Sequence, residues 1–439
     1  MLASEQEASI FNVLGFSGAP DKPGSHRAMI QRAIDAAYEQ CGGRVLLPSG
    51  NVFTSGTIVL KPGVELVIEK GAVLKASSDP ADYLTGPKTI PGLVTADGAD
   101  HVAISGGGII DGNEEAFHDV VTRYHVSGKA FRPQMIHLEA CRHATISGIT
   151  IRGAPAWTIH PLGCEDLRID GIRILNSLRM ANSDGIDPDH CRGVRITGCH
   201  IECADDCIVM KNTAAGAAYG PCEDIVISGC TLVSTSAAVK IGSETVDDFR
   251  RIVVSDCLIS RSNRGLGIQL RDGGNVEDVI FSDIAIGTRL FYPRYWGKAE
   301  PIYVTSIDRS AAVKSGTVRN VSFHNIVCTG ENGIYVCGQE RNPIRDLRFD
   351  NVRIALVKRS RWDAGVQDPR PGTRGELIRG RTPALYLEHA RNVRLHGVDV
   401  RFDADLPETY GEAVETLDAE VEGMESLHVA DERKGTSRG

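Results

Sequence analysis

The sequence contains no run of eighteen apolar residues, which excludes a helix that could span a membrane. Its first sixteen residues lack a basic segment followed by an apolar stretch, so we expect no secretory signal and a cytoplasmic protein. Basic charge is not in excess either, because the formal net charge is −9 and Lys and Arg are scattered along the chain. We therefore expect neither a membrane nor a nucleic acid as a partner.

Disulfides are not expected, although the chain has twelve cysteines. Without a secretory signal, free thiols in a reducing compartment are the favoured interpretation. Cys199, Cys203 and Cys207 could suggest a metal site, but their spacing fits strand alternation, and Cys is a normal small core residue. The sequence thus predicts no metal and no cofactor.

The chain does contain a short repeat: a polar residue, an apolar residue, any residue, an apolar residue, and then Ser, Thr, Asp or His. Copies begin at residues 143, 166, 193, 224, 251 and 278, which gives intervals of 23, 27, 31, 27 and 27 residues. Further copies begin at 101, 320, 346 and 392. Alternation with period two is typical of strands, and strands this short bury their faces only by stacking.

A column of apolar residues accompanies the repeat, six positions after each start. Its members are Ile149, Ile172, Cys199, Cys230, Cys257, Ile284, Ile326, Val352 and Val398. We expect this column to point inward in every coil. The sequence therefore predicts an all-β protein, a right-handed parallel β-helix (a solenoid) of about ten coils.

One segment near the N-terminus departs from the strand pattern. Residues 25–39 carry apolar residues at helical spacing, begin with a Ser that could cap a helix, and precede Gly42 and Gly43, which would end it. Such a helix would cover the open end of the stack. We expect a single domain over residues 1–439, divided into an N-terminal cap (1–50), the coils (51–405), and a C-terminal coil and tail (406–439).

Two acidic motifs, NSDGIDPD and ADDCIVMK, lie about one repeat apart. Stacked coils would bring Asp184 close to Asp205 and Asp206, and adjacent carboxyl groups that face a third suit cleavage of a glycosidic bond by acid and base. Because like charges on neighbouring coils resist ionising together, one carboxyl group should keep its proton near neutral pH. For Asp187 and Asp189 we expect the ordinary role of turn residues, which is to cap backbone amides.

The chain resembles glycoside hydrolase family 28, the polygalacturonase-like β-helix enzymes, over nearly its whole length. The resemblance is carried by these two motifs, by the N-terminal stretch AIDAAYEQCGGRVLLPSG and by the stretch RPQMIHLEACRHATISGITIRG. The resemblance implies inverting hydrolysis. It implies that Asp205 is the general acid, and that Asp184 and Asp206 hold and deprotonate the attacking water. For this mechanism we expect about 6.5–9.5 Å between acid and base.

The chain departs from the family at the places where polygalacturonases carry the motifs G-H-G and R-I-K. In STSAAVKIGSE, Ser236 or Ala237 stands in place of the His. In RGLGIQLRD, Gly267 and Gln269 stand where two cations would grip a galacturonate carboxylate. Other cations nearby lie at different offsets, and pairing with a carboxylate depends on geometry. We therefore expect that the protein is not an ordinary polygalacturonase.

An insertion from residue 289, RLFYPRYWGKAEPIYVTSIDR, is rich in aromatic and charged residues. It could present a sugar-binding face or form an aromatic plug, and the sequence leaves both open. A large loop on the side of the cleft would close one end of the groove and favour exo-action on an oligosaccharide. The residues that we expect to bind this substrate are His160, Lys211, Lys240, Glu244, Arg264, Gln269, Arg271, Trp296 and Glu300.

Three alternatives remain open at this point. The first is a galacturonidase that acts on pectic oligosaccharides. The second is a β-helix uronate lyase or epimerase, although such enzymes usually use Ca²⁺ or a basic pair at the centre of the site. The third is a non-catalytic glycan-binding solenoid, which would not need Asp205 and Asp206 on the same face.

Overall fold

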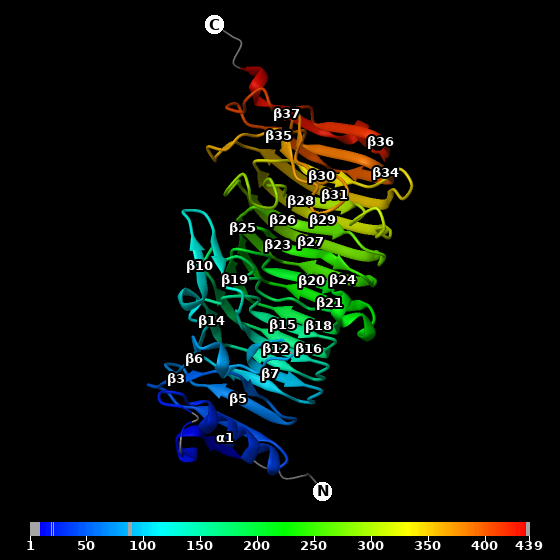
Figure 1. Ribbon diagram of the computed structural model, residues 1–439. Coiled ribbons are helices and arrows are strands. Elements are labelled where there is room, and N and C mark those ends of the chain that lie inside the picture. The colour runs from blue at the N-terminus through cyan, green and yellow to red at the C-terminus, as the bar shows by residue number, and fades with distance from the viewer. Residues whose placement is uncertain (1–8, 19, 21, 87–89, 436–439) are drawn as a thin grey trace.

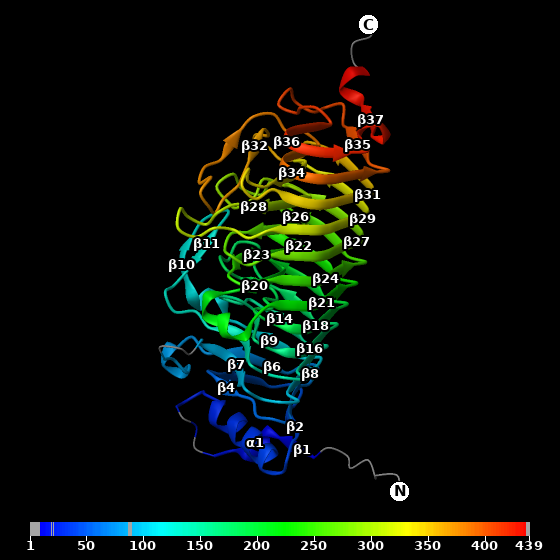
Figure 2. The same cartoon turned by 90° about the vertical axis from the view of Figure 1, so that its right-hand side faces the viewer.

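The computed structural model describes residues 9–18, 20, 22–86 and 90–435. The outer ends of the expected cap and tail, residues 1–8 and 436–439, lie outside this part of the chain. The described chain is an elongated stack of coils, with helix α1 (Arg27–Glu39) at one end and strand β37 (His428–Asp431) at the other (Figures 1 and 2). The strands of each coil pair in parallel with those of the neighbouring coils, so the predicted parallel β-helix is confirmed.

Three parallel sheets run along the stack. The first contains β1 (Ile10–Asn12), β2 (Gly43–Leu47), β5 (Val64–Ile68), β8 (Ala103–Gly106), β13 (Thr145–Ser147), β16 (Glu165–Asp170), β18 (Arg192–Thr197), β21 (Cys222–Ser228) and β24 (Phe249–Ser255). The second contains β3 (Val52–Ser55), β6 (Val73–Ala76), β9 (Ile109–Asp111), β14 (Thr150–Arg152), β17 (Arg173–Leu175), β19 (His200–Cys203), β22 (Thr231–Ser234), β25 (Leu258–Ser262), β35 (Asp399–Phe402) and β37.

The third sheet contains β4 (Ile58–Val59), β7 (Gly92–Asp97), β12 (Gln134–Glu139), β15 (Ile159–Leu162), β20 (Ile208–Asn212), β23 (Ala237–Thr245), β26 (Arg264–Leu270), β28 (Ile302–Ser306) and β30 (Ile334–Cys337). Long strands bend from one sheet into the next: β27 (Val276–Thr288), β29 (Val318–Gly330), β31 (Ile344–Leu356), β34 (Leu385–His396) and β36 (Val414–Glu422). Short 3₁₀ helices are η1 (Val13–Phe16), η2 (Pro80–Asp82), η3 (Glu114–Phe117), η4 (Ala214–Tyr219), η5 (Met424–Ser426) and η6 (Glu432–Gly435).

Each repeat begins at a residue with left-handed backbone geometry. From residue 143 to residue 392, the first residue of every copy has φ between 52° and 67°, and the residue five positions later has φ between 52° and 68°. Gly, Asn and Asp adopt this conformation at the lowest cost, and these types dominate both positions. The polar first residue of the repeat therefore reflects a turn between strands as well as contact with solvent.

The predicted inward column is confirmed, because each of its nine members is at most 3% exposed. A second column stacks Phe281, Phe323 and Phe349 from neighbouring coils, with ring centroids 5.1 and 5.0 Å apart. All twelve cysteines are free thiols, as expected, and all but Cys41 are buried. The stack thus has one continuous apolar interior.

The predicted helix is also present, but α1 begins two residues after Ser25. The Ser25 hydroxyl still accepts a hydrogen bond from the Arg27 amide at 3.3 Å. The helix buries Ile30 and Ile34 against the first coils and covers that end of the stack (Figure 1). No helix in the described part of the chain is both long and apolar enough to cross a membrane.

Among the connections between the second and third sheets, three insertions contact one another: residues 112–133, 289–301 and 357–384. The first carries the antiparallel hairpin β10 (His118–Val121) and β11 (Val126–Gly128), and the last carries β32 (Val366–Gln367) and β33 (Ile378–Arg379). The insertions meet through aromatic rings, since Tyr292 stacks on Tyr124 at 5.0 Å and lies edge-on to Trp362 at 6.2 Å. We call these three insertions together the loop wall.

Candidate active site

Consecutive coils bring the three predicted aspartates together. Asp184 lies between β17 and β18, and Asp205 and Asp206 lie in the turn between β19 and β20. The Gly185 amide donates to the Asp206 carbonyl oxygen at 2.9 Å, so the two coils meet at the acidic cluster itself. Only glycine fits at position 185, because a Cβ atom there would lie 2.3 Å from the Cys207 carbonyl oxygen.

The three carboxyl groups approach one another through single oxygen atoms, and the separation of about 6.5–9.5 Å between acid and base stays a prediction for the whole groups. One oxygen from each of Asp184, Asp205 and Asp206 lies within 4.8 Å of one from each of the others. These oxygens are close because the groups come from adjacent coils, which are about 4.8 Å apart, and from consecutive residues. Carboxylates at this spacing could hold a cation, and two Lys ammonium groups already bring positive charge to the cluster.

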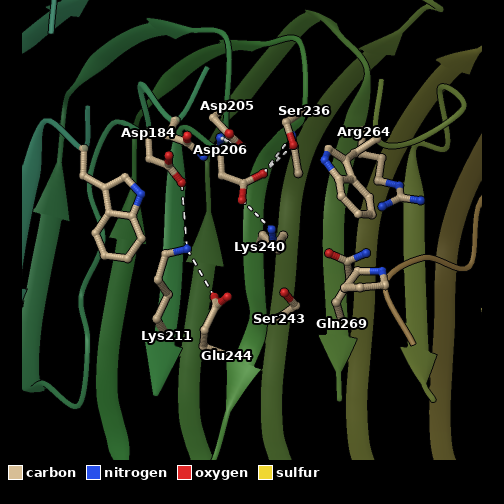
Figure 3. A pocket seen from close by; sticks show the side chains of 15 residues that line it. Asp184, Asp205, Asp206, Lys211, Ser236, Lys240, Ser243, Glu244, Arg264 and Gln269 are labelled. Atoms are coloured by element: carbon tan, nitrogen blue, oxygen red, sulfur yellow. Dashed lines mark hydrogen bonds and ion pairs between the residues drawn. The ribbon is translucent and has the colours of Figure 1, made fainter. Parts of the chain in front are cut away.

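Asp206 is held on both of its carboxylate oxygens. Oδ1 accepts hydrogen bonds from the Ser236 hydroxyl at 2.8 Å and from the Ala237 amide at 3.1 Å. Oδ2 lies 2.5 Å from the Lys240 ammonium (Figure 3). Burial alone would raise the pKa of Asp206, but Lys240 and Lys211 outweigh it and hold this pKa below its ordinary value. Asp206 is therefore the ionised member of the cluster.

In the other two aspartates, the pKa is raised rather than lowered. Burial, together with the charge of Asp206, raises the pKa of Asp205 to about 6. Burial and Asp205 raise the pKa of Asp184 well above its ordinary value, while Lys211 acts in the opposite direction. The cluster therefore keeps a proton at mildly acidic pH next to an ionised carboxylate, which is the division that acid–base cleavage needs.

Lys211 forms a second charged group on the floor of the site. Its ammonium lies 3.9 Å from Asp184, 3.7 Å from Asp187 and 3.4 Å from Glu244, and it lies 4.5 Å from the centre of the Trp157 ring. Asp187 makes no hydrogen bond, so the predicted capping role is wrong for this residue. The same prediction is confirmed for Asp189, whose carboxylate accepts from the Thr213 amide at 2.9 Å and from its hydroxyl at 2.7 Å.

The aspartates line a cavity of about 220 Å³ (Figure 3). Of the nine residues predicted to bind substrate, six line this cavity: Lys211, Lys240, Glu244, Arg264, Gln269 and Trp296. Arg264 is buried and fully engaged, since its guanidinium donates to Glu300 at 3.0 Å and to the Asp368 carbonyl oxygen at 2.8 Å. Gln269 donates to the Arg370 carbonyl oxygen at 3.3 Å.

The structure does not bring the other three into the cavity. Arg271 is fully buried and donates to carbonyl oxygens of residues 270, 369 and 371 and to Thr305, so it anchors the insertion 357–384. Glu300 is the buried partner of Arg264. His160 lines an adjoining hollow and bonds to Asp189 and Gln134, at 3.3 and 3.2 Å.

Sequence analysis missed several residues that line the cavity: Trp157, Asn182, Ser243 and Pro371. Trp157 could have been found, because it lies three residues before His160 in a coil next to the aspartates. Pro371 gave no such signal, since it lies on an insertion more than 160 residues from the motifs. The adjoining hollow, about 420 Å³, shares Trp157 and Asn182 with the cavity and extends toward the N-terminal coils.

The aromatic insertion 289–301 has residues both within the loop wall and at the cavity. Tyr292 packs within the loop wall, as a plug would. Trp296 lines the cavity and is 46% exposed, as a sugar-binding face requires. The Tyr295 hydroxyl donates to the Ala204 carbonyl oxygen at 2.9 Å, which ties the insertion to the turn that carries Asp205.

Comparison with known proteins agrees with this geometry. Residues 43–363 match the family model described as glycosyl hydrolases family 28. A protein named probable polygalacturonase from Vitis vinifera is 29% identical over 378 residues, which cover 80% of this chain and 75% of that protein. The exopolygalacturonase of Thermotoga maritima superposes with a TM-score of 0.65 at 26% identity, over 80% of this chain and 89% of that one. The family 28 exopolygalacturonase of Yersinia enterocolitica superposes with a TM-score of 0.69 at 19% identity, over 96% and 78%.

A family model that covers most of the coils, a parallel β-helix and a trio of aspartates in a cavity lead to the same assignment. The chain belongs to glycoside hydrolase family 28 and is an inverting glycosidase.

Proposed function

We propose that this glycosidase is exo-acting, that it removes a terminal sugar from pectic oligosaccharides, and that this sugar is uncharged. The names of its relatives, polygalacturonase and exopolygalacturonase, support a pectic substrate. In the proposed mechanism Asp205 protonates the leaving oxygen, Asp206 takes a proton from the attacking water, and Asp184 helps to hold that water. The opposite pKa shifts of Asp205 and Asp206 support this division.

The observation that carries the proposal is the state of the cations in the cavity. Lys240 is paired with Asp206, Lys211 lies among three carboxylates, and Arg264 is paired with Glu300. A buried cation that already has a protein carboxylate gains little from a second one in the substrate. Galacturonate at the cleaved position would therefore lack a free cation to bind.

Exo-action is supported by the shape of the site. Trp296 and Pro371, both from the loop wall, line the cavity. The Arg370 guanidinium lies 5.1 Å from the centre of the Trp296 ring, so the two insertions contact each other there. In the other direction the cavity adjoins the hollow lined by Arg132, Gln134 and His160. A chain could occupy the hollow while its last sugar lies against the closed end.

The test uses pairs of oligosaccharides that share a galacturonate backbone and differ only in the terminal sugar, which is either galacturonate or a neutral hexose or pentose. We expect a higher kcat/KM for release of the neutral terminal sugar than for release of galacturonate. Chromatography of the single-sugar products measures both rates. Efficient release of galacturonate from polygalacturonate would contradict the uncharged terminal sugar. Early appearance of mid-sized fragments would contradict exo-action.

One observation favours a second candidate, a galacturonidase. Glu244 is the most exposed partner of Lys211, with 41% of its side chain accessible, and their charged atoms are 3.4 Å apart. A galacturonate carboxylate could displace Glu244 and take its place beside Lys211. In that case Glu244→Gln should lower KM for galacturonate-terminated substrates and leave KM for neutral ones unchanged. An equal KM effect on both would remove this candidate.

A further inference from the structure

Lys240 lies on the floor of the cavity in the coil that follows the aspartates. In β23 it is the register partner of Val209 on one side and of Gly267 on the other. Gly267 has no side chain, and the nearest atoms to a Cβ built there are the Lys240 Cγ at 3.6 Å and the Val239 carbonyl oxygen at 3.7 Å. The neighbour of Lys240 on the next coil therefore has no side chain that could occupy the space of the lysine side chain.

Within 4.0 Å, the described residues offer its ammonium one carboxylate partner, Asp206, at 2.5 Å, and the side chain of Asp206 is 1% exposed. The other charged and titratable groups around Asp206 are Asp184, Asp187, Asp205, Lys211 and Tyr295. Lys211 lies nearer to Asp184, Asp187 and Glu244. Among the three aspartates of the cluster, Asp205 is the one without a Lys or Arg nitrogen within 4.0 Å, as far as the described residues show.

We propose that Lys240 is a positioning residue that decides where the proton of the catalytic cluster lies. By pairing with Asp206 it keeps that carboxylate ionised, so the protons that the crowded cluster retains lie on Asp205 and Asp184 rather than on Asp206. Lys240 is therefore not a cation for gripping substrate. This inference rests on the proposed roles of Asp205 and Asp206, and it assigns to Lys240 an electrostatic function within the enzyme itself.

The consequence is a specific dependence on pH. Without the ammonium, Asp206 competes with Asp205 for the proton, and the correctly protonated form is lost as pH falls. An opposite charge at this distance typically lowers a carboxyl pKa by about 1–3 units. Lys240→Met should therefore move the acid limb of the kcat/KM profile upward by about 1–3 pH units and reduce activity at pH 5 far more than at pH 7.

The experiment compares wild type, Lys240→Met, Lys240→Gln and Lys240→Arg on the best neutral-terminated substrate, with circular dichroism to select folded variants. Lys240→Arg, which keeps the charge, should retain the wild-type acid limb. A uniform drop at every pH in both neutral variants would indicate a structural role and overturn the proposal. A higher KM for charged substrates with unchanged limbs would make Lys240 a substrate-binding residue and also overturn it.

A second measurement separates this inference from the proposed function. Carbon-detected NMR titration of the aspartate side chains, in substrate-free wild type and Lys240→Gln, reports protonation without any turnover. We expect the Asp206 carboxyl to titrate at higher pH in the variant. If wild type hydrolyses no oligosaccharide but this shift occurs, the proposed function fails and the role of Lys240 stands. If hydrolysis occurs and the titration is unchanged, Lys240 does not control the proton.

Discussion

Asp205 and Asp206 are neighbours in sequence, yet they differ in charge because their immediate contacts differ. Asp206 touches an ammonium, a hydroxyl and an amide, all of which favour a carboxylate. Asp205 is buried next to the charge of Asp206, and these two effects outweigh the influence of Lys240 and Lys211 and favour the acid form. The same residue type thus supplies both a proton donor and a proton acceptor.

Removing the proposed acid should reveal its role through the leaving group. Asp205→Asn should lower kcat by about 10²–10⁴ on ordinary oligosaccharides, because leaving-oxygen protonation is lost. Aryl glycosides with good leaving groups should lose much less, since they need little protonation. Steady-state kinetics on both substrate classes checks this, with Asp205→Glu as the variant that keeps an acid. An equal loss on both classes would count against Asp205 as the acid.

The pH dependence of the wild-type enzyme should follow from the same groups. In the proposed mechanism activity requires protonated Asp205, whose pKa is about 6, and ionised Asp206, whose pKa is lowered. We therefore expect kcat/KM to be highest on the acid side of neutral and to fall as pH rises through about 6. A profile still rising between pH 6 and 8 would show that a different group donates the proton.

The raised pKa also affects stability. The pKa of Asp205 is about 6 in the folded protein and 3.8 in a model peptide. Ionisation of Asp205 therefore destabilises the folded state, and this destabilisation is complete above pH 6 and absent below pH 3.8. Asp205→Asn should therefore raise the melting temperature at pH 7.5 and leave it unchanged at pH 3.5. Thermal denaturation at the two pH values checks this. A gain of the same size at pH 3.5 would mean that packing, not charge, is responsible.

The sequence was sufficient to predict where the aspartates lie, but it was insufficient to predict the partners of the cations. The two acidic motifs lie one coil apart, so the repeat alone predicted that their carboxyl groups share a cavity. Arg264 and Arg271 each donate to carbonyl oxygens of residues 368–371, about a hundred residues later in the chain. Residue type does not reveal such a partner, which is why Arg271 was wrongly expected in the cavity.

The insertion 357–384 depends on one buried carboxylate. Asp368 is fully buried and accepts from the Gly297 amide at 3.0 Å and from Arg370 at 2.7 Å, and it lies 3.4 Å from the Lys298 ammonium. It thus joins two parts of the loop wall that both contribute residues to the lining of the cavity.

Asp368→Ala should leave Lys298 buried without its partner and cost about 3 kcal/mol of unfolding free energy, as broken buried ion pairs do. Because Trp296 and Pro371 flank this residue, KM for the terminal sugar should rise as well. Denaturant unfolding and steady-state kinetics test both effects. Asp363→Ala, an exposed position in the same insertion, is the matched control and should change neither. An unchanged KM would show that the closed end does not hold the sugar.

Elements built from the repeat were predicted well, whereas the insertions were not. The strands alternate and recur, so their burial pattern follows from spacing. The insertion 357–384 has no alternation, and its structure comes from side chains that contact residues of other coils. The aromatic insertion was predicted to lie at the cleft, yet only the structure distinguishes Tyr292 in the wall from Trp296 in the cavity.

At the scale of the whole molecule, stability comes from contacts between neighbouring coils. The central ring of the phenylalanine column, Phe323, is 1% exposed and contacts a ring on either side. Phe323→Ala should cost about 3–5 kcal/mol, because it leaves a cavity between two coils. The folded variant should keep wild-type KM, since the column lies away from the aspartates. Chemical denaturation with kinetics checks this, and a changed KM would show that coil packing is transmitted to the site.

The three insertions all leave the stack between the same two sheets, while the aspartates are fixed by backbone bonds from one coil to the next. The coils therefore carry the aspartates, and the insertions add Trp296 and Pro371 to the lining of the same cavity. Related enzymes could exchange or lengthen any one of these insertions, and acquire a new preference for sugars, without moving a proton donor. Sugar preference could then change during evolution while the catalytic aspartates keep their positions.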